Sequence, residues 1–403
     1  MEKLKIAGFQ ISFLLILFLP IACRQKYIWF TELQRTHQAD THRVVRVYMD
    51  RYGDFYPSDK IYIDSRYFLP EKPLNTIASA SLEHYFTSSK ERIDELSKFY
   101  SEPAGGSPTE VYRNIQTKIL QNYAAQIGIA GDKYKSKQVV IVVHGFNDPN
   151  PTGTYQELRN AIDSNSLDKN RELLYIEIYW DGLSAYGGNP GLSKIWALAQ
   201  FNSRYVALGL RSLMNKLPPK LPVVMITHSL GASVGTGALF NTFYKWNDKE
   251  MSDSFKEITE LSKEPYPKGP VKLGMLAAAI PGEGTFHDLV YEPNSDVISG
   301  NNNIQRIVVA INPFDYALHK GVFGTSRYLS PRFGATTLGN NYNKEAEKVR
   351  TLLMKKYPSV DHFYFTIPFS TPAYGGESQE HGLHFYLEDK VPTKKFLNEL
   401  LRP

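Results

Sequence analysis

Cysteine is almost missing from this chain, because Cys23 is the single one among 403 residues. One cysteine excludes an intramolecular disulfide and a cysteine-based zinc site. Long runs of lysine and arginine are missing too, and the net charge of +5 is spread over mixed signs. We therefore expect no nucleic-acid partner. No HExxH pattern occurs either, and we expect neither a metal site nor a cofactor.

The composition is otherwise that of an ordinary globular protein, with 42% hydrophobic and 22% charged residues. A prior of roughly 150 residues per domain suggests two or three domains, although a large α/β enzyme often forms one. The chain is thus long enough to bury a sizeable core.

The first residues have the pattern of a secretory signal. Lys3 and Lys5 precede an apolar stretch, Phe13 to Leu19, which Gln10 and Pro20 bound on either side. The stretch is shorter than the ~20 apolar residues of a transmembrane helix. We therefore expect residues 1–22 to be removed as a signal peptide.

The stretch "LPIAC" that ends at Cys23 resembles the cleavage site of bacterial lipoproteins, in which the cysteine carries lipid. Pro20 departs from the pattern, since a leucine is usual three places before the cysteine. The resemblance implies lipidation of Cys23 and anchoring in the bacterial cell envelope. Arg24, in place of an aspartate, favours the outer membrane. A plain cleaved signal with an incidental cysteine and an uncleaved anchor are the alternatives.

From Gln138 onwards, continuous apolar runs alternate with helical patterns. Runs of this kind are typical of strands buried on both faces of a parallel sheet. Strands are expected at 138–145, 173–180, 221–229, 271–281, 304–313 and 362–369, and helices at 155–163, 194–215, 230–246, 343–356 and 392–401. The alternation predicts an α/β fold with a mostly parallel, doubly wound sheet and helices on both faces.

The segment from Arg24 to Tyr134 is harder to interpret. Val44 to Met49 and Lys60 to Ile63 resemble short strands, and helical spacing covers Ser81 to Tyr100 and Pro108 to Ile129. Two interpretations stay open: an accessory part with helices, or the opening strands of the main sheet.

Ser229 stands where a buried strand meets a helix. Thr227, His228, Ser229, Leu230 and Gly231 match the nucleophile-elbow pattern G-x-S-x-G, with a threonine in place of the first glycine. A sharp turn there would lift the serine hydroxyl to the carboxyl end of the sheet, where ligands gather. The alternative is a serine that only caps the helix.

The elbow and the stretch "VVHGFN", which contains His144 and Phe146, resemble the α/β-hydrolase superfamily. They are most similar to a bacterial branch long filed as a domain of unknown function, with HGF and x-H-S-x-G motifs. The resemblance spans Gln138 to Tyr386. It implies an α/β-hydrolase domain over 136–403 that follows an N-terminal region over 23–135. It also implies an oxyanion hole formed by the N–H groups of Phe146 and Leu230, with His144 shaping the loop.

The family's order of catalytic residues is serine, acid, histidine. Asp315 follows a late strand, and Asp315, Ala317 and Leu318 are similar to the branch's D-x-A-L pattern, so the resemblance implies that Asp315 is the acid. A helix-capping role for Asp315 is the alternative. Asp361 is a rival acid, but it precedes a strand.

Two histidines compete for the role of the base. His381 and His384 both follow the last strand, and "GLHFYL" places an aromatic residue directly after His384, as the branch favours. We therefore expect His384 to be the base, with His381 as the alternative. His362 starts a strand and His319 fits no pattern.

These residues predict a serine hydrolase that cleaves carboxylic esters, with lipid or acyl esters favoured for an enzyme anchored at a membrane. The alternatives are a catalytically inactive, surface-anchored binding or scaffold protein of the same fold, and an amidase or peptidase. Two loops, 180–201 and 281–302, are expected to line the substrate pocket with Tyr186, Trp196, Phe201 and Phe286. Ordinary packing is the other interpretation of these aromatics.

Overall fold

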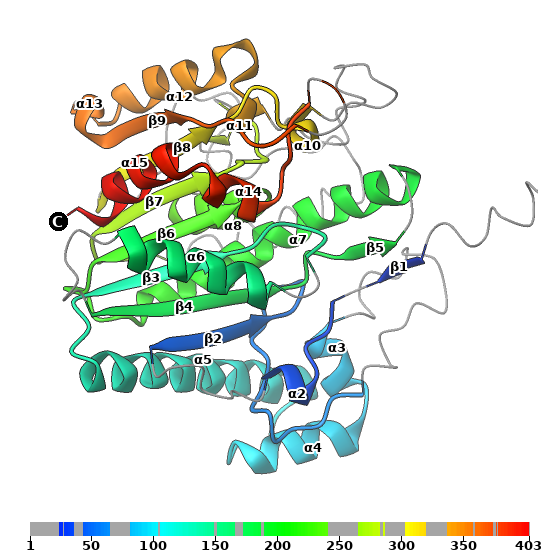
Figure 1. The fold of residues 1–403 in the computed structure, drawn as a ribbon. Helices are drawn as coiled ribbons and strands as arrows, with labels where there is room; N and C mark the ends of the chain where they lie inside the picture. Colours follow the sequence, from blue (N-terminus) through cyan, green and yellow to red (C-terminus); the bar gives the residue numbers. More distant parts are fainter. Residues whose placement is uncertain are drawn as a thin grey trace, which may run out of the picture.

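The computed structural model describes residues 24–26, 28–35, 43–64, 81–103, 105–148, 151–165, 172–186, 189–240, 265–282, 285–286, 303–319, 337–357, 359–373, 376 and 378–402. A seven-stranded sheet forms the centre of this part of the chain (Figure 1). Its strands, in spatial order, are β2 (Val44–Met49), β4 (Leu173–Trp180), β3 (Gln138–Val143), β6 (Val223–His228), β7 (Val271–Leu276), β8 (Ile304–Ile311) and β9 (Tyr364–Pro368).

Every neighbouring pair in this sheet is parallel. Helices cover both faces of a parallel sheet, and its strands therefore appear in the sequence as continuous apolar runs. All six residues of β3 and all eight of β4 are buried. The predicted α/β fold with a parallel, doubly wound sheet is therefore confirmed.

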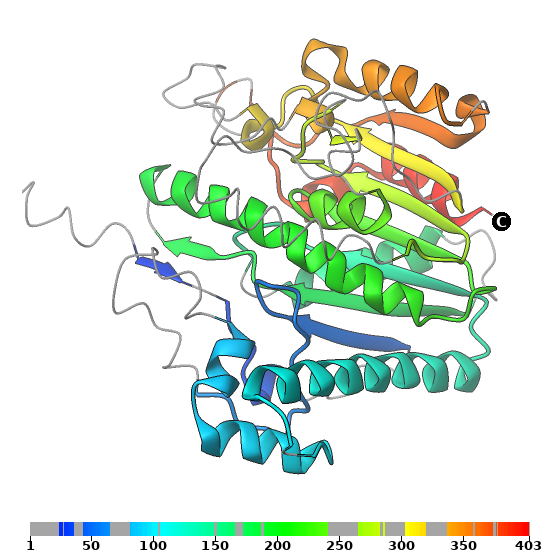
Figure 2. The same cartoon turned by 180° about the vertical axis from the view of Figure 1, so that it is seen from behind.

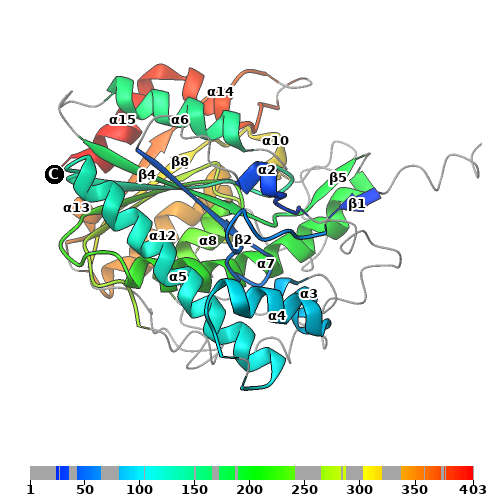
Figure 3. The ribbon, with the colours of Figure 1, turned by 90° about the horizontal axis from the view of Figure 1, so that it is seen from below.

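Helices cover the two faces of the sheet. Figures 1 and 3 place α6 (Thr152–Asn165), α14 (Leu383–Glu388) and α15 (Lys390–Leu401) on one face. Figure 2, from behind, shows α5 (Pro108–Lys133), α7 (Asn189–Asn215) and α8 (Gly231–Leu239) on the other. This arrangement brings the carboxyl ends of β3, β6 and β8 to one edge, with loops above them.

Further elements complete the described chain. They are β1 (Arg24–Lys26), α2 (Glu32–Arg35), α3 (Leu82–Thr87), α4 (Lys90–Phe99), β5 (Ser184–Tyr186), α10 (Tyr316–His319), α11 (Thr337–Asn340), η5 (Tyr342–Lys344), α12 (Glu345–Met354) and α13 (Val360–Phe363). The helical pattern from Ser81 to Tyr100 is split into α3 and α4, because Ser89 caps a new helix by accepting from the N–H of Arg92.

The N-terminal segment adds a strand to the main sheet. β2 pairs with β4 from Val44–Tyr175 to Met49–Trp180, so Val44 to Met49 are an edge strand of this sheet. The helices α3, α4 and α5 pack together below that edge (Figure 1). The structure thus combines the two interpretations of this region, because it contains both a strand of the main sheet and a helical part.

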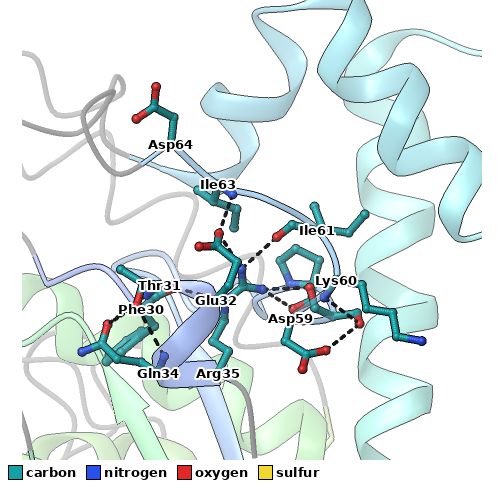
Figure 4. Close-up of polar contacts among 12 residues, drawn as sticks. Phe30, Thr31, Glu32, Gln34, Arg35, Asp59, Lys60, Ile61, Ile63 and Asp64 are labelled. Atoms are coloured by element: carbon teal, nitrogen blue, oxygen red, sulfur yellow. Dashed lines mark hydrogen bonds and ion pairs between the residues drawn. The ribbon is translucent and has the colours of Figure 1, made fainter.

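Lys60 to Ile63 do not form the expected strand, because side chains take up the backbone groups of this stretch (Figure 4). The buried guanidinium of Arg35 donates to the carbonyl of Ile61 at 2.9 Å and to that of Pro57 at 2.6 Å. The carboxylate of Glu32 accepts from the N–H of Ile63 at 2.8 Å. Because these backbone groups already have hydrogen-bond partners, the stretch does not need to pair with a neighbouring strand.

The expected signal peptide and Cys23 lie outside the described residues. Within the described ranges, no helix combines the length and the apolarity of a bilayer-spanning segment.

Candidate active site

Ser229 occupies a strained turn between β6 and α8. Its φ of 53° lies in the left-handed region, which a residue other than glycine seldom adopts. Hydrogen bonds hold this backbone in place: the Ser229 N–H donates to the carbonyl of Leu276 at 3.0 Å, and its carbonyl accepts from Ala279 at 3.2 Å. A non-glycine residue kept in this conformation by its surroundings is typical of a functional site. An ordinary N-cap has an extended backbone, so this conformation is not that of a helix cap. It is the sharp strand-to-helix turn that the G-x-S-x-G pattern predicts.

Two glycines leave the room that this turn needs. A Cβ on Gly145 would lie 2.7 Å from the Cβ of Ser229, and one on Gly231 would lie 2.6 Å from the carbonyl oxygen of His144. Both distances are shorter than any contact that a carbon side chain tolerates. The HG pair after β3 and the glycine after the elbow are therefore required by the same close approach.

Thr227 fits in place of the motif's first glycine because Gly235 lies opposite it. A Cβ on Gly235 would meet the Thr227 Cγ2 methyl at 2.8 Å. The Thr227 hydroxyl donates to the carbonyl of Gly274 at 3.3 Å. The glycine one turn into α8 thus provides the space that a β-branched residue at this position takes up.

The imidazole of His381 lies between Ser229 and Asp315. Its Nε2 is 2.9 Å from the Ser229 Oγ, and its Nδ1 is 2.8 Å from the Asp315 Oδ2 and 2.9 Å from the Oδ1. Asp315 is fully buried and Ser229 is 4% exposed. The three side chains are thus hydrogen-bonded in series, with the imidazole between the serine hydroxyl and the aspartate carboxylate.

The expectation that His384 lies beside Ser229 is wrong. His384 belongs to α14, in which Leu383, Tyr386 and Leu387 form the buried face. A residue one place after Leu383 points away from that face, and His384 is exposed, with its ring against that of Phe385 at 3.8 Å between centroids. His381 precedes the helix in a loop, and the structure brings this histidine to Ser229.

Backbone pairing holds the loop of His381 on the loop of Asp315. The N–H of Gln379 donates to the carbonyl of Phe314 at 2.8 Å, and the N–H of Tyr316 donates to the carbonyl of Gln379 at 3.0 Å. Thr371 adds its hydroxyl, which donates to the carbonyl of Glu380 at 2.6 Å. His381 lies two residues after Gln379 in the sequence, so the pairing of Gln379 with Asp315 brings His381 to the acid.

The Asp315 carboxylate is satisfied by donors on every side. Besides His381, the N–H groups of Ala317 and Leu318 donate to Oδ1 at 3.0 and 3.1 Å, and the Tyr386 hydroxyl donates to Oδ2 at 2.7 Å. Burial, and then the charge of Asp315, raise the pKa of Tyr386 far above its ordinary value, so the phenol keeps its proton and remains a donor. Asp315 also caps α10 through these N–H groups, so the capping interpretation holds beside the contact with His381. Sequence reasoning missed Tyr386, because an aromatic residue in a helix carries no sign of its partner.

Asp361, the rival acid, lies at the other edge of the sheet. It belongs to α13, directly before β9, and pairs with Arg350 on the surface. In a parallel sheet the start of a strand is opposite to the carboxyl ends where Ser229 lies. Its position excludes a contact with His381.

His144 has both ring nitrogens engaged with backbone groups. Its Nε2 accepts from the N–H of Trp180 at 3.2 Å, and its Nδ1 therefore donates to the carbonyl of Gly145 at 2.7 Å. Burial lowers the pKa of His144, which keeps the ring neutral. The ring ties the ends of β3 and β4 together and shapes the loop that carries Gly145, and it leaves no nitrogen for proton transfer.

The backbone N–H groups of Phe146 and Leu230 are the two that the resemblance implies for an oxyanion hole. Leu230 is the N-cap of α8, and Phe146 follows Gly145, the glycine that lies tightly against Ser229. Within the described part of the chain, neither N–H donates to another protein group. Both are therefore available to an acceptor in the site.

The four expected pocket aromatics have different surroundings. Trp196 packs edge-to-face on Phe146 at 4.8 Å between centroids. Phe286 is fully buried against Phe240, and Phe201 is buried against Tyr205. The side chain of Tyr186 and the loop from 287 to 302 lie outside the described residues. Of the three whose side chains are described, Trp196 is the one with a ring contact to Phe146.

The comparisons with known proteins add little. The chain matches no protein-family model and no curated protein. Among solved structures it is similar to the apo form of Thermogutta terrifontis esterase 2, with 11% identity over 65% of this chain and 81% of that chain and a TM-score of 0.26. A likeness at this level carries no argument about function.

The described residues contain no group of three or more histidine, cysteine, aspartate or glutamate side chains that could hold a metal ion.

Proposed function

We propose that the protein is a serine hydrolase of the α/β-hydrolase type that cleaves carboxylic esters through Ser229, His381 and Asp315. The observation that carries this proposal is the continuous chain of hydrogen bonds from the Ser229 hydroxyl through His381 to Asp315. The left-handed backbone at Ser229 supports it independently, because a serine that only filled space would not need it.

The first half of the reaction follows from these contacts. His381 Nε2 takes the proton of the Ser229 hydroxyl as the oxygen attacks the ester carbonyl carbon. Asp315 keeps the other ring proton on Nδ1 and stabilises the imidazolium that forms. The carbonyl oxygen becomes an oxyanion, for which the N–H groups of Phe146 and Leu230 serve as donors.

The second half reverses these roles. The imidazolium of His381 gives its proton to the alkoxide leaving group, and an acyl-serine remains on Ser229. Water then loses a proton to His381 and attacks the acyl carbon. Collapse of the second tetrahedral intermediate returns the proton to Ser229 and releases the carboxylic acid.

Acyl or lipid esters are the substrate class that we propose. Phe314 and Tyr316, on either side of the buried Asp315, are 54% and 40% exposed, although both are large and mainly apolar. The ring centroid of Tyr316 lies 6.4 Å from that of His381, and exposed aromatics next to the proposed triad suit an apolar acyl chain. A lipid anchor on Cys23 would hold the enzyme at the bacterial envelope beside such substrates.

A fluorophosphonate probe with mass analysis of the labelled peptide tests the proposal. We expect the label on Ser229 and turnover of p-nitrophenyl esters. Ser229→Ala should abolish the labelling and lower kcat by about 10⁴- to 10⁶-fold, with an unchanged circular dichroism spectrum. Ser233→Ala, one turn further along α8, is the matched control and should keep both activities.

The same assays separate the other functions. An unlabelled wild-type protein without ester turnover would favour the inactive binding or scaffold protein. Faster turnover of p-nitroanilides than of p-nitrophenyl esters would favour an amidase or peptidase. Labelling of another serine would overturn the assignment of Ser229.

A further inference from the structure

His228, the residue before the serine, contacts the backbone of His381. Its ring Nε2 lies 3.0 Å from the carbonyl oxygen of His381, and the centroids of the two imidazoles are 5.1 Å apart at an angle of 41°. A carbonyl oxygen only accepts hydrogen bonds. His228 must therefore carry its proton on Nε2 and donate it to His381.

His228 stays a neutral donor under ordinary conditions. Burial, and then the neighbouring His381, lower the pKa of His228 to about 3. A neutral ring does not repel the imidazolium that His381 becomes during the proposed reaction. It also has no bond to the Ser229 hydroxyl, whose ring partner is His381.

The contact links two parts of the site that are distant in sequence. His228 and Ser229 are neighbours at the end of β6, so one strand end places the nucleophile and a donor to the loop of His381. The other described anchors of this loop hold Gln379 and Glu380, which precede the histidine. Among the hydrogen bonds of the described residues, the bond from His228 is the one that acts on His381's own backbone.

We propose that His228 is a positioning residue, whose Nε2–H holds the His381 carbonyl so that the imidazole reaches Ser229 and Asp315 together. This inference rests on the proposed function. Without the bond, the backbone at residue 381 can shift while Asp315 keeps its contacts with α10. A shift of about 1 Å in a catalytic group lowers the rate by up to about 100-fold.

Two amide substitutions test the reach of the donor. The side-chain amide of His228→Gln places an N–H close to where Nε2 lies, whereas that of His228→Asn ends about one bond shorter. We expect His228→Gln to keep kcat within about threefold of the wild type and His228→Asn to lower kcat by about 10- to 100-fold, with KM unchanged. Both variants are polar, so a difference between them is not one of polarity.

A spectroscopic readout accompanies the kinetics. The proton on His381 Nδ1, shared with Asp315, should give a far-downfield proton NMR signal in the wild type and in His228→Gln. It should broaden or disappear in His228→Asn and in His228→Met, which fills the space without a donor. Circular dichroism and the Tm establish that each variant is folded, and His362→Gln, at an exposed histidine, is the control.

Failure of this inference is distinct from failure of the proposed function. A wild-type kcat and NMR signal in folded His228→Asn and His228→Met, with an inactive Ser229→Ala, would overturn the role of His228 alone. Equal losses in His228→Gln and His228→Asn would also overturn it, because the reach of the donor would not matter. An active Ser229→Ala would instead overturn the proposed function.

Discussion

Gln379 pairs through its backbone with both neighbours of Asp315, and this bridge decides which histidine reaches the acid. The two segments are far apart in the sequence. Once they are paired, His381 lies two residues beyond the bridge and its ring contacts Asp315 and Ser229. His384 is carried one residue into α14 and onto its exposed side.

The first prediction separates the two histidines. His381→Gln should lower kcat by about 10³- to 10⁴-fold, because the general base is lost. His384→Gln should keep kcat within about twofold. Steady-state ester hydrolysis checks both, and an inactive His384→Gln beside an active His381→Gln would reverse the assignment.

The second prediction concerns the phenol that donates to Asp315. Tyr386→Phe removes the 2.7 Å hydrogen bond and leaves a buried carboxylate with one donor fewer. We expect a loss of about 1–3 kcal/mol in the free energy of unfolding and a lower kcat. Denaturant unfolding measures the first. Tyr364→Phe is the control, since that buried hydroxyl has no hydrogen-bond partner in the described part of the chain, and its removal should cost far less.

The third prediction concerns the room made for Thr227. Gly235→Ala should destabilise the fold by about 1–3 kcal/mol, because its Cβ would meet the Thr227 methyl. Thr227→Ser removes that methyl and keeps the hydroxyl that bonds to Gly274. In the double variant, Gly235→Ala should therefore cost less than in the wild type. Additive losses in the double-mutant cycle would contradict the contact.

The fourth prediction is a pH dependence of stability at Asp181. Burial raises the pKa of Asp181 from 3.8 to about 6. Between these values the folded chain holds a proton that the unfolded chain has released, so stability falls as the pH rises through this window. Over this pH window the contribution of Asp181 lowers the free energy of unfolding by about 3 kcal/mol.

The test for Asp181 is its asparagine variant. Asp181→Asn keeps an oxygen to accept from Ile28 and Leu183, both of which donate to Oδ1. Because an asparagine side chain does not titrate, the free energy of unfolding of this variant should fall less than that of the wild type from pH 4 to pH 6. Parallel curves for the two proteins would show that Asp181 has no raised pKa.

The fifth prediction concerns the proposed anchor. In bacterial cells, the mature protein should begin at a lipid-modified Cys23 and fractionate with the membrane, because several acyl chains on one cysteine anchor stably. Cys23→Ser should move into the soluble fraction. An unmodified wild-type N-terminus with equal membrane binding of the variant would mean that Cys23 is incidental.

Local patterns in the sequence were sufficient to predict the parallel sheet and the sharp turn at Ser229. A strand buried on both faces is a continuous apolar run, and an elbow is a strand, a serine and small residues within one stretch, so neighbours in sequence carry the whole signal. The strand Val44–Met49 was recognised as a strand, but its place at the edge of the main sheet was left open. Its partner β4 lies more than a hundred residues away, and the pattern of one strand does not identify another.

The choice of His381 and the contacts of Tyr386 and His228 were decided by the tertiary structure alone. Each depends on which segments meet at the carboxyl ends of the strands. Gln379 pairs with Asp315, Tyr386 of α14 contacts Asp315, and the end of β6 contacts the loop of His381. Two histidines three residues apart look alike in a sequence. Register and helix rotation put one against Ser229 and the other in solvent, because a shift of a few residues turns a side chain to a different face.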